Sequence, residues 1–244
     1  DAAGFAELIV ALVPEDDRVV ARDAIRLEGV RAARAELAAA YFRANAGEWD
    51  RLRRLHLPED EIEAAVVEMV APLQAGDLVD LGTGTGRVLE VLAPHVVRGI
   101  GIDVSREMLA VARANLEAAG VRNCHVRQGD ILSLPLDDGS ADLVTLHHVL
   151  HSLGEPAKAV DEAARLLRPG GHLLVVDFAP HELEILRTEH AHRRLGFADA
   201  EVRGWVQRAG LDFRSVRDLP PAAPAADKLT VKFWLGRRPD RGEA

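Results

Sequence analysis

The chain has 244 residues, a formal net charge of −9 and a single cysteine, Cys124. One cysteine excludes an internal disulfide and any Cys-rich metal site, and no uncharged apolar run reaches the roughly 18 residues that span a membrane. The net charge is negative, whereas a surface that binds nucleic-acid phosphates is positively charged. We therefore expect a cytoplasmic protein without membrane or nucleic-acid partners.

Residues 1–72 predict an all-helical extension in front of a larger domain at 73–244. Between Pro14 and Gly47, apolar residues recur at three- and four-residue steps, which is the spacing of an amphipathic helix. Further helices are expected at 48–56 and 58–71. The apolar face of the long helix can pack on the larger domain or pair with a second copy of the chain, so a homodimer is plausible.

A glycine-rich loop follows the first strand expected in the larger domain. The stretch 79–86, VDLGTGTG, places three glycines at alternate positions before a helix that starts at Arg87. Glycine adopts positive φ cheaply and lets a ligand approach the backbone near the free N–H groups of the helix. The spacing matches neither the dinucleotide fingerprint nor the P-loop, and Asp80 suits an ammonium-bearing ligand better than a pyrophosphate.

An acidic residue, Asp103, ends the second expected strand, residues 98–103. A βαβ unit places such a carboxylate over a ribose diol, so Asp103 is the candidate for ribose binding. Ser105 can cap the helix that follows, with Met108 in its first turn. The other interpretation is that Asp103 merely caps this helix.

Further strands follow in the order of an α/β sheet. A third strand is expected at 124–128, a fourth ending at His147, and a fifth ending near Asp177. Beyond the fifth strand we expect helices at 181–196 and 199–209 and two last strands. The candidate residues lie at the carboxyl ends of consecutive parallel strands, which is where open α/β sheets bind ligands.

The loop at 80–86 and the landmarks after it resemble the class I S-adenosylmethionine (SAM) dependent methyltransferases over about residues 75–180. The resemblance implies a Rossmann-like α/β sheet with helices on both faces and a site for SAM and its product, S-adenosylhomocysteine. In the family an acid commonly grips the adenine amino group and an aliphatic neighbour packs on the ring, although such an acid can also merely stabilise a turn. The implied cofactor contacts are Asp80, Gly82, Thr83, Gly84, Gly86, Asp103, Met108, Asp130, Ile131 and the backbone of His147.

The stretch 41–50, YFRANAGEWD, resembles the lid of small-molecule methyltransferases, in which a Tyr and a Trp-Asp pair close over SAM and substrate. It adds Tyr41 and Trp49 to the cofactor site, unless these aromatics are ordinary core residues. With 177–181 and 190–197, this region also resembles proteins that fuse an ArsR-type winged-helix repressor to a methyltransferase. Since the chain begins at Asp1 rather than Met, we expect a lost upstream piece, which would be the DNA-binding module.

Two groups of histidines lie on the rim that faces the methyl group in this fold. One group is His147, His148 and His151, and the other is His181, His190 and His192. They can bind or deprotonate the methyl acceptor, ligate a divalent metal beside a carboxylate such as Asp177 or Glu189, or be ordinary polar residues. We take His147, His148 and His181 as the catalytic candidates, assign no metal ligand, and expect the two groups to approach each other.

These patterns favour an enzyme that transfers the methyl group of SAM to a small-molecule acceptor. Such a displacement mainly needs alignment of the reacting atoms and exclusion of water, so no motif identifies the acceptor. The alternative is a domain that binds SAM or S-adenosylhomocysteine without turnover and reports it to a DNA-binding module.

Overall fold

The computed structural model describes residues 18–46, 59–190, 192–221, 229–240 and 242. The chain divides into two compact units, residues 1–39 and 40–244. The helices in the described ranges are α2 (Arg18–Asn45), α4 (Glu59–Val70), α5 (Arg87–Leu92), α6 (Arg106–Ala118), α7 (Pro156–Leu166), α8 (Glu184–Glu189) and α9 (Asp199–Arg208), with short 3-10 turns η2 (Ala71–Leu73), η3 (Ala93–His95) and η4 (Leu150–Ser152). The strands are β1 (Asp77–Leu81), β2 (Arg98–Asp103), β3 (Cys124–Gln128), β4 (Ala141–His147), β5 (Leu167–Phe178), β6 (Asp212–Leu219) and β7 (Val231–Arg237).

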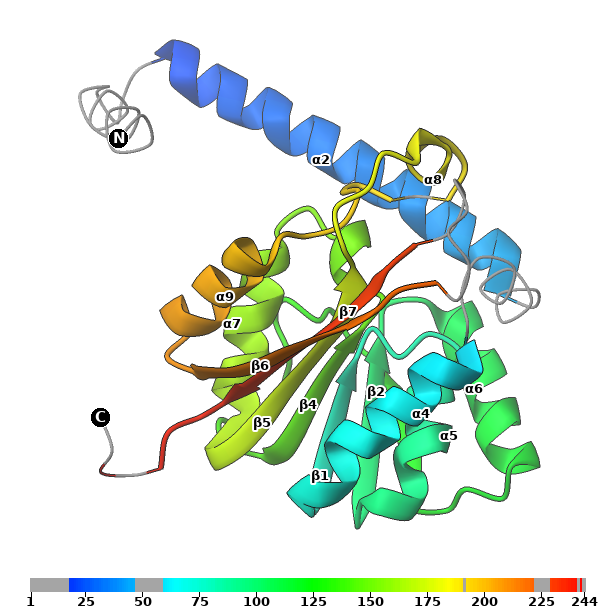
Figure 1. Ribbon diagram of the computed structural model, residues 1–244. Helices are drawn as coiled ribbons and strands as arrows, with labels where there is room; N and C mark the ends of the chain where they lie inside the picture. The colour runs from blue at the N-terminus through cyan, green and yellow to red at the C-terminus, as the bar shows by residue number, and fades with distance from the viewer. Residues whose placement is uncertain (1–17, 47–58, 191, 222–228, 241, 243–244) are drawn as a thin grey trace. The chain divides into compact units, whose positions relative to one another are not determined.

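A seven-stranded mixed sheet in the order β3-β2-β1-β4-β5-β7-β6 organises the larger unit (Figure 1). The strands β1 to β5 pair in parallel, and β7 is antiparallel to both of its neighbours. The carboxyl ends of the five parallel strands therefore meet at one edge of the sheet. This topology confirms the predicted Rossmann-like α/β architecture.

Helices cover both faces of the sheet, with α4, α5 and α6 on one face and α7 and α9 on the other (Figure 1). One apolar cluster includes Val160 of α7 and Trp205 of α9, and the other includes Ile62 of α4 and Leu89 of α5. Each fully buried aliphatic side chain stabilises the fold by about 1.5–3 kcal/mol. The boundary that we expect after residue 72 stays a prediction, while Ile62 places α4 in the core of the larger unit.

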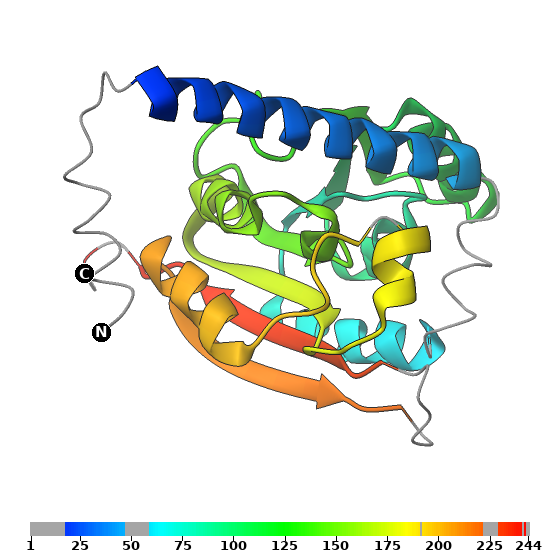
Figure 2. The same cartoon turned by 90° about the horizontal axis from the view of Figure 1, so that it is seen from above.

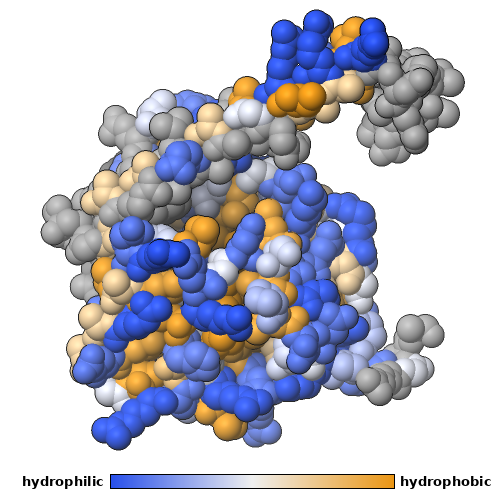
Figure 3. Space-filling model, turned by 180° about the vertical axis from the view of Figure 1, so that it is seen from behind, coloured by the Kyte–Doolittle hydropathy of each residue, from blue (hydrophilic) through white to orange (hydrophobic). Residues whose placement is uncertain are grey.

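The long helix predicted between Pro14 and Gly47 is present as α2. Large apolar side chains are exposed along it, beside charged ones (Figure 3): Val19, Val20, Ile25, Leu27 and Val30. The helix predicted at 58–71 is present as α4, whereas the one predicted at 48–56 lies outside the described residues. Within the described ranges, no helix combines the length and the apolar character needed to cross a membrane.

The predicted helix at 181–196 is wrong, because among its described residues only those of α8 are helical. The backbone on both sides of α8 makes long-range hydrogen bonds in place of helical ones. His181 N–H donates to Leu195 O at 3.0 Å, and Arg193 N–H donates to His151 O at 2.8 Å. The described part of this segment therefore folds back over the carboxyl end of β5, as Figures 1 and 2 show for α8.

The exposed apolar side chains of α2 lead to a prediction about assembly. If Val20 and Leu27 lie in a dimer interface, Leu27→Glu should yield a monomer, because an unpaired charge is costly at an apolar contact. Ile25→Glu is the matched control, since residue 25 lies about 140° around the helix from residue 20. Light scattering of the full-length variants checks this, and a monomeric unsubstituted chain would remove the dimer.

Candidate functional site

The loop between β1 and α5 has the backbone that its glycines allow. Gly82, Gly84 and Gly86 have φ values of 75°, 54° and 80°, in the left-handed region that glycine adopts most readily. The N–H groups of Gly82 and Thr83 both donate to Ile102 O, at 2.8 and 2.9 Å. The loop is thus tied to β2 at the carboxyl edge of the sheet.

The three glycines face different surroundings. A Cβ at Gly82 would lie 2.4 Å from Val149 Cγ2, and one at Gly86 would lie 3.1 Å from Ala112 Cβ. A Cβ at Gly84 would meet nothing within 4 Å. Gly82 and Gly86 therefore permit close internal packing, whereas the backbone of Gly84 faces open space that a ligand can enter.

Asp103 lies beside this open space at the end of β2. Its Oδ2 accepts the Gly84 N–H and its Oδ1 accepts the Ser105 N–H, both at 2.9 Å. Burial raises the pKa of the Asp103 carboxyl, and the N–H groups of Ser105 and Gly84 oppose that rise. Because a carboxylate offers about four lone-pair sites, Asp103 can hold the loop and still accept bonds from a diol.

The other acidic candidate, Asp80, lies deeper in the sheet and is only 1% exposed. Its Oδ1 accepts the hydroxyl of Thr145 on β4 at 2.6 Å. Asp80 thus places a carboxylate below the glycine loop. Thr83 is also buried, and its hydroxyl makes no hydrogen bond within the part of the chain that the structure describes.

Arg87, directly after the loop, is directed toward carboxylates. Its Nε and Nη2 donate to the two carboxylate oxygens of Glu63 on α4, each at 2.6 Å, and its Nη1 donates to Glu90 at 2.8 Å. The hydrogen bonds to Glu63 are the main cause of the raised pKa of Arg87. A guanidinium held in this way is not presented to a phosphate, which agrees with a loop that lacks phosphate-binding motifs.

The candidates after β3 and on α6 are placed at the same edge. Asp130 is exposed, and its Oδ1 accepts the Leu132 N–H at 2.9 Å in a local turn, so the turn-stabilising interpretation describes a contact that it makes. Ile131 is buried in the cluster that contains Ile102. Met108 is 2% exposed, and its N–H donates to Ser105 Oγ at 3.2 Å.

Four of the histidines that follow β4 and β5 lie around Phe178, the last residue of β5. The centroid of its ring lies 4.7 Å from that of His148, 5.2 Å from His151, 5.7 Å from His192 and 6.0 Å from His181. Burial is the main cause of the lowered pKa of both His181 and His192. Both groups therefore favour the neutral imidazole more than a solvent-exposed histidine does.

His147 ends β4, and its ring lies 4.6 Å from that of His148 in an edge-on arrangement. His148 has a φ of 52°, and its N–H donates to Val176 O at 2.8 Å. A positive φ is uncommon for a residue with a Cβ. The turn after β4 thus directs the His148 side chain differently from a continued strand.

A buried histidine-carboxylate pair lies at the centre of this cluster. His151 Nδ1 is 2.9 Å from Asp177 Oδ1, and the His151 N–H donates to Asp177 Oδ2 at 3.2 Å. The sequence alone indicated His151 only as one of several rim histidines, and Asp177 only as one of two carboxylates that could stand beside them. Asp177 carried the same signal as Asp103, an acidic residue near the carboxyl end of a strand, which could have marked it as a site residue.

The structure does not describe the lid expected in residues 41–50. Trp49 lies outside the described residues, and Tyr41 belongs to α2 without a described side chain. Their assignment to the cofactor site stays a prediction.

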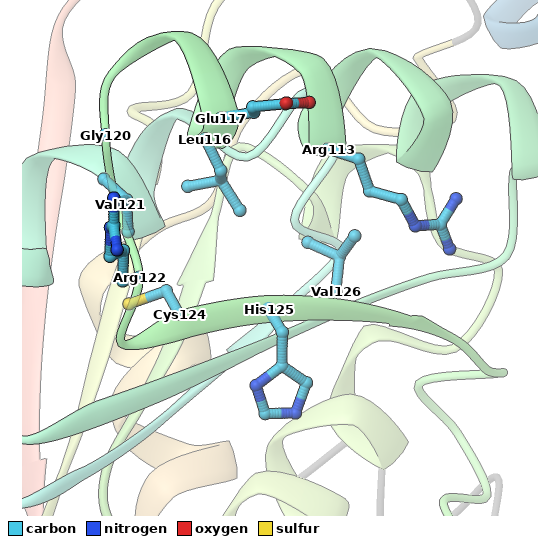
Figure 4. A pocket seen from close by; sticks show the side chains of 9 residues that line it. All are labelled: Arg113, Leu116, Glu117, Gly120, Val121, Arg122, Cys124, His125 and Val126. Carbon is cyan, nitrogen blue, oxygen red and sulfur yellow. The ribbon is translucent and has the colours of Figure 1, made fainter.

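A hollow of about 410 Å³ lies elsewhere, between the end of α6 and the start of β3 (Figure 4). Its lining includes Arg113, Val121, Cys124 and His125. This is the amino end of β3, so the hollow is separate from the edge that carries Gly84 and Asp103.

Comparisons with known proteins agree with the geometry of that edge. The family model for the methyltransferase domain matches residues 79–175. The uncharacterized methyltransferase YcgJ of Bacillus subtilis is 37% identical over 106 residues, which are 43% of this chain and 42% of the relative. Its crystal structure covers 73% of this chain and 98% of its own, with a TM-score of 0.61 and 23% identity.

Two further proteins extend the comparison. A demethylmenaquinone methyltransferase of Clavibacter sepedonicus is 32% identical over 62% of this chain and 59% of its own length. The N-methyltransferase NodS of Bradyrhizobium japonicum, solved with S-adenosylhomocysteine, has the same fold, with a TM-score of 0.61 and 20% identity over 75% of this chain and 88% of its own. Residues 79–175 therefore match a methyltransferase domain, and the chain spans only 42% and 59% of the lengths of the two curated relatives.

The open space at Gly84 yields a prediction with a matched control. Gly84→Ala and Gly120→Ala each introduce a Cβ at positive φ, 54° and 70°, where nothing lies within 4 Å. Both should cost about 1–2 kcal/mol of unfolding free energy. Only Gly84→Ala should also weaken S-adenosylhomocysteine binding in calorimetry, since its Cβ would fill the ligand's space; equal affinities would contradict this assignment.

Proposed function

We propose that this protein transfers the methyl group of SAM to a small-molecule acceptor at the carboxyl edge of β1, β2, β4 and β5. The observation that carries the proposal is the Asp103 carboxylate, held 2.9 Å from the Gly84 N–H beside open space. A fixed acceptor beside an exposed backbone suits a ribose diol. The methyltransferase domain match over the same residues supports this interpretation.

Each side of the edge has a distinct part in the proposed cofactor site. Gly82 to Gly86 let the methionine part of SAM approach the backbone, and Asp80 supplies negative charge for its ammonium group. Asp103 accepts hydrogen bonds from the ribose hydroxyls, while Asp130 and Ile131 receive the adenine. Met108 and the His147 backbone complete this set.

The proposed methyl transfer requires few catalytic side chains. SAM, when bound, supplies a methyl group on a sulfonium, and the protein must align the acceptor with it and exclude water. The Phe178 ring and the imidazoles around it would offer a small organic acceptor an aromatic surface with a few polar atoms. His147, His148 and His181 are the proposed groups for taking a proton from the acceptor.

Two further parts of the proposed protein lie outside the described side chains, a lid and an upstream module. Tyr41 and Trp49 would close over the cofactor as a lid, and an upstream ArsR-type module would account for the resemblance of the flanking segments. The net charge of −9 supports an acceptor other than nucleic acid. A cytoplasmic location fits the single cysteine.

Cofactor binding can be tested before the acceptor is known. Asp103→Ala should weaken S-adenosylhomocysteine binding by about 1.5–3 kcal/mol, or roughly 10- to 150-fold, because it removes a charged hydrogen-bond acceptor. Asp137→Ala, which removes an exposed carboxylate from the loop before β4, should leave the affinity unchanged. Isothermal calorimetry measures both, and an undiminished affinity in Asp103→Ala would remove the ribose assignment.

Turnover requires a separate experiment. The full chain incubated with methyl-labelled SAM and a metabolite extract should transfer the label to a low-molecular-weight product. Gly84→Ala, as the control with weakened cofactor binding, should transfer less label at the same SAM concentration. Tight cofactor binding without labelled product would contradict the enzymatic proposal and favour a sensing domain.

A further inference from the structure

The residues around Phe178 include three whose metal-binding atoms converge. The candidate ligand atoms of His148, His151 and Asp177 all lie within 4.8 Å of one another. A tetrahedral ion with ligand distances of about 2.0–2.2 Å holds its ligands roughly 3.5 Å apart, so small side-chain movements suffice to close the site. Two imidazoles and one carboxylate form the donor set of many open transition-metal sites.

We propose that His148, His151 and Asp177 bind one divalent transition-metal ion, with Zn²⁺ as the reference ion, at the carboxyl ends of β4 and β5. Asp177 belongs to β5, His148 directly follows β4, and His151 lies in η4, between β4 and α7. The ion would lie on the side of the site that faces the methyl acceptor. The metal site rests on the proposed function and extends it, but metal binding itself can be measured without any methyl acceptor.

The charge of Asp177 favours an ion at this place. The side chain is 0% exposed, and its Oδ1 accepts the Phe178 N–H at 2.9 Å. Within the described part of the chain its only ion-pair partner is His151, and no Lys or Arg reaches it. A buried carboxylate is costly unless a positive charge compensates it, and a divalent cation supplies that charge.

The backbone of His148 also points to a built site. Its φ of 52° is strained for a residue with a Cβ, and the hydrogen bond from its N–H to Val176 O holds that conformation. Both ring nitrogens of His148 are buried. The strained turn therefore keeps an imidazole inside the cluster, which is what a metal ligand requires.

Two neighbouring imidazoles are left with unused nitrogens. The His192 ring stacks on His151 with centroids 3.9 Å apart, and His181 lies against Phe178. His192 Nδ1 and His181 Nε2 are buried and make no hydrogen bond with any described residue. Buried polar atoms usually have a partner, and an ion, or water bound to it, would provide one for each.

The competing interpretation is a metal-free pair in which Asp177 orients His151. The 2.9 Å contact would then keep the proton on Nδ1 and leave Nε2 as a base. In that case the cluster would hold no ion under any condition. Metal titration therefore separates the two.

The experiment uses the full chain, stripped with chelator and titrated with ZnCl₂ by calorimetry. We expect one ion per chain, and at least a roughly 100-fold loss of affinity in His148→Ala and in His151→Ala, since even second-shell changes cost 10- to 100-fold. His125→Ala, which removes an exposed histidine of β3, should bind Zn²⁺ like the unsubstituted chain. Co²⁺ should give visible absorption bands that His148→Ala lacks.

Two controls keep the outcomes separate. Circular dichroism and S-adenosylhomocysteine binding verify that each variant is folded, and His148→Ala, in a half-buried residue, carries the test if a change at Asp177 prevents folding. Failure of the unsubstituted chain to bind Zn²⁺, or an affinity in both histidine variants equal to that of the unsubstituted chain, would overturn the metal site. Binding of S-adenosylhomocysteine by the metal-free chain would then still support the proposed function. The loss of S-adenosylhomocysteine binding in Asp103→Ala tests the proposed function alone and does not involve the metal.

Discussion

The parallel register of β1 between β2 and β4 is the constraint on which the whole site depends. Asp80 pairs with Gly101 on one side and with Thr145 on the other. The glycine loop, Asp103 and His147 consequently leave the sheet at nearly the same level. A slip of one residue would turn the Asp80 side chain to the opposite face, and it would separate the loop from the carboxylate that accepts the Gly84 N–H.

This edge divides into two chemically different halves that meet at Val149. On the β1–β2 side, an open backbone at Gly84 stands beside the Asp103 carboxylate. On the β4–β5 side, imidazoles and the Asp177 carboxylate surround Phe178. The proximity of Val149 to Gly82 joins the halves, so we interpret them as the cofactor side and the acceptor side of one site.

The sequence predicted the parts of the fold that local patterns determine. Glycine spacing predicted the loop that contains Gly84, and the strand pattern predicted that Asp103 ends β2, since each depends on a short stretch of chain. The His151–Asp177 pair was not predicted as a unit, because it depends on the left-handed backbone of His148 and on residues 26 positions apart. The helix expected at 181–196 failed for a related reason: distant carbonyl groups, such as that of His151, compete for its backbone N–H groups.

A crystal structure of the chain with bound S-adenosylhomocysteine would test the central claim most directly. We predict that the adenosyl group lies along the glycine loop, with both ribose hydroxyls within hydrogen-bond distance of the Asp103 carboxylate and the amino group on the Asp80 side. Density for the ligand in the hollow beside β3, or a ribose turned away from Asp103, would contradict it.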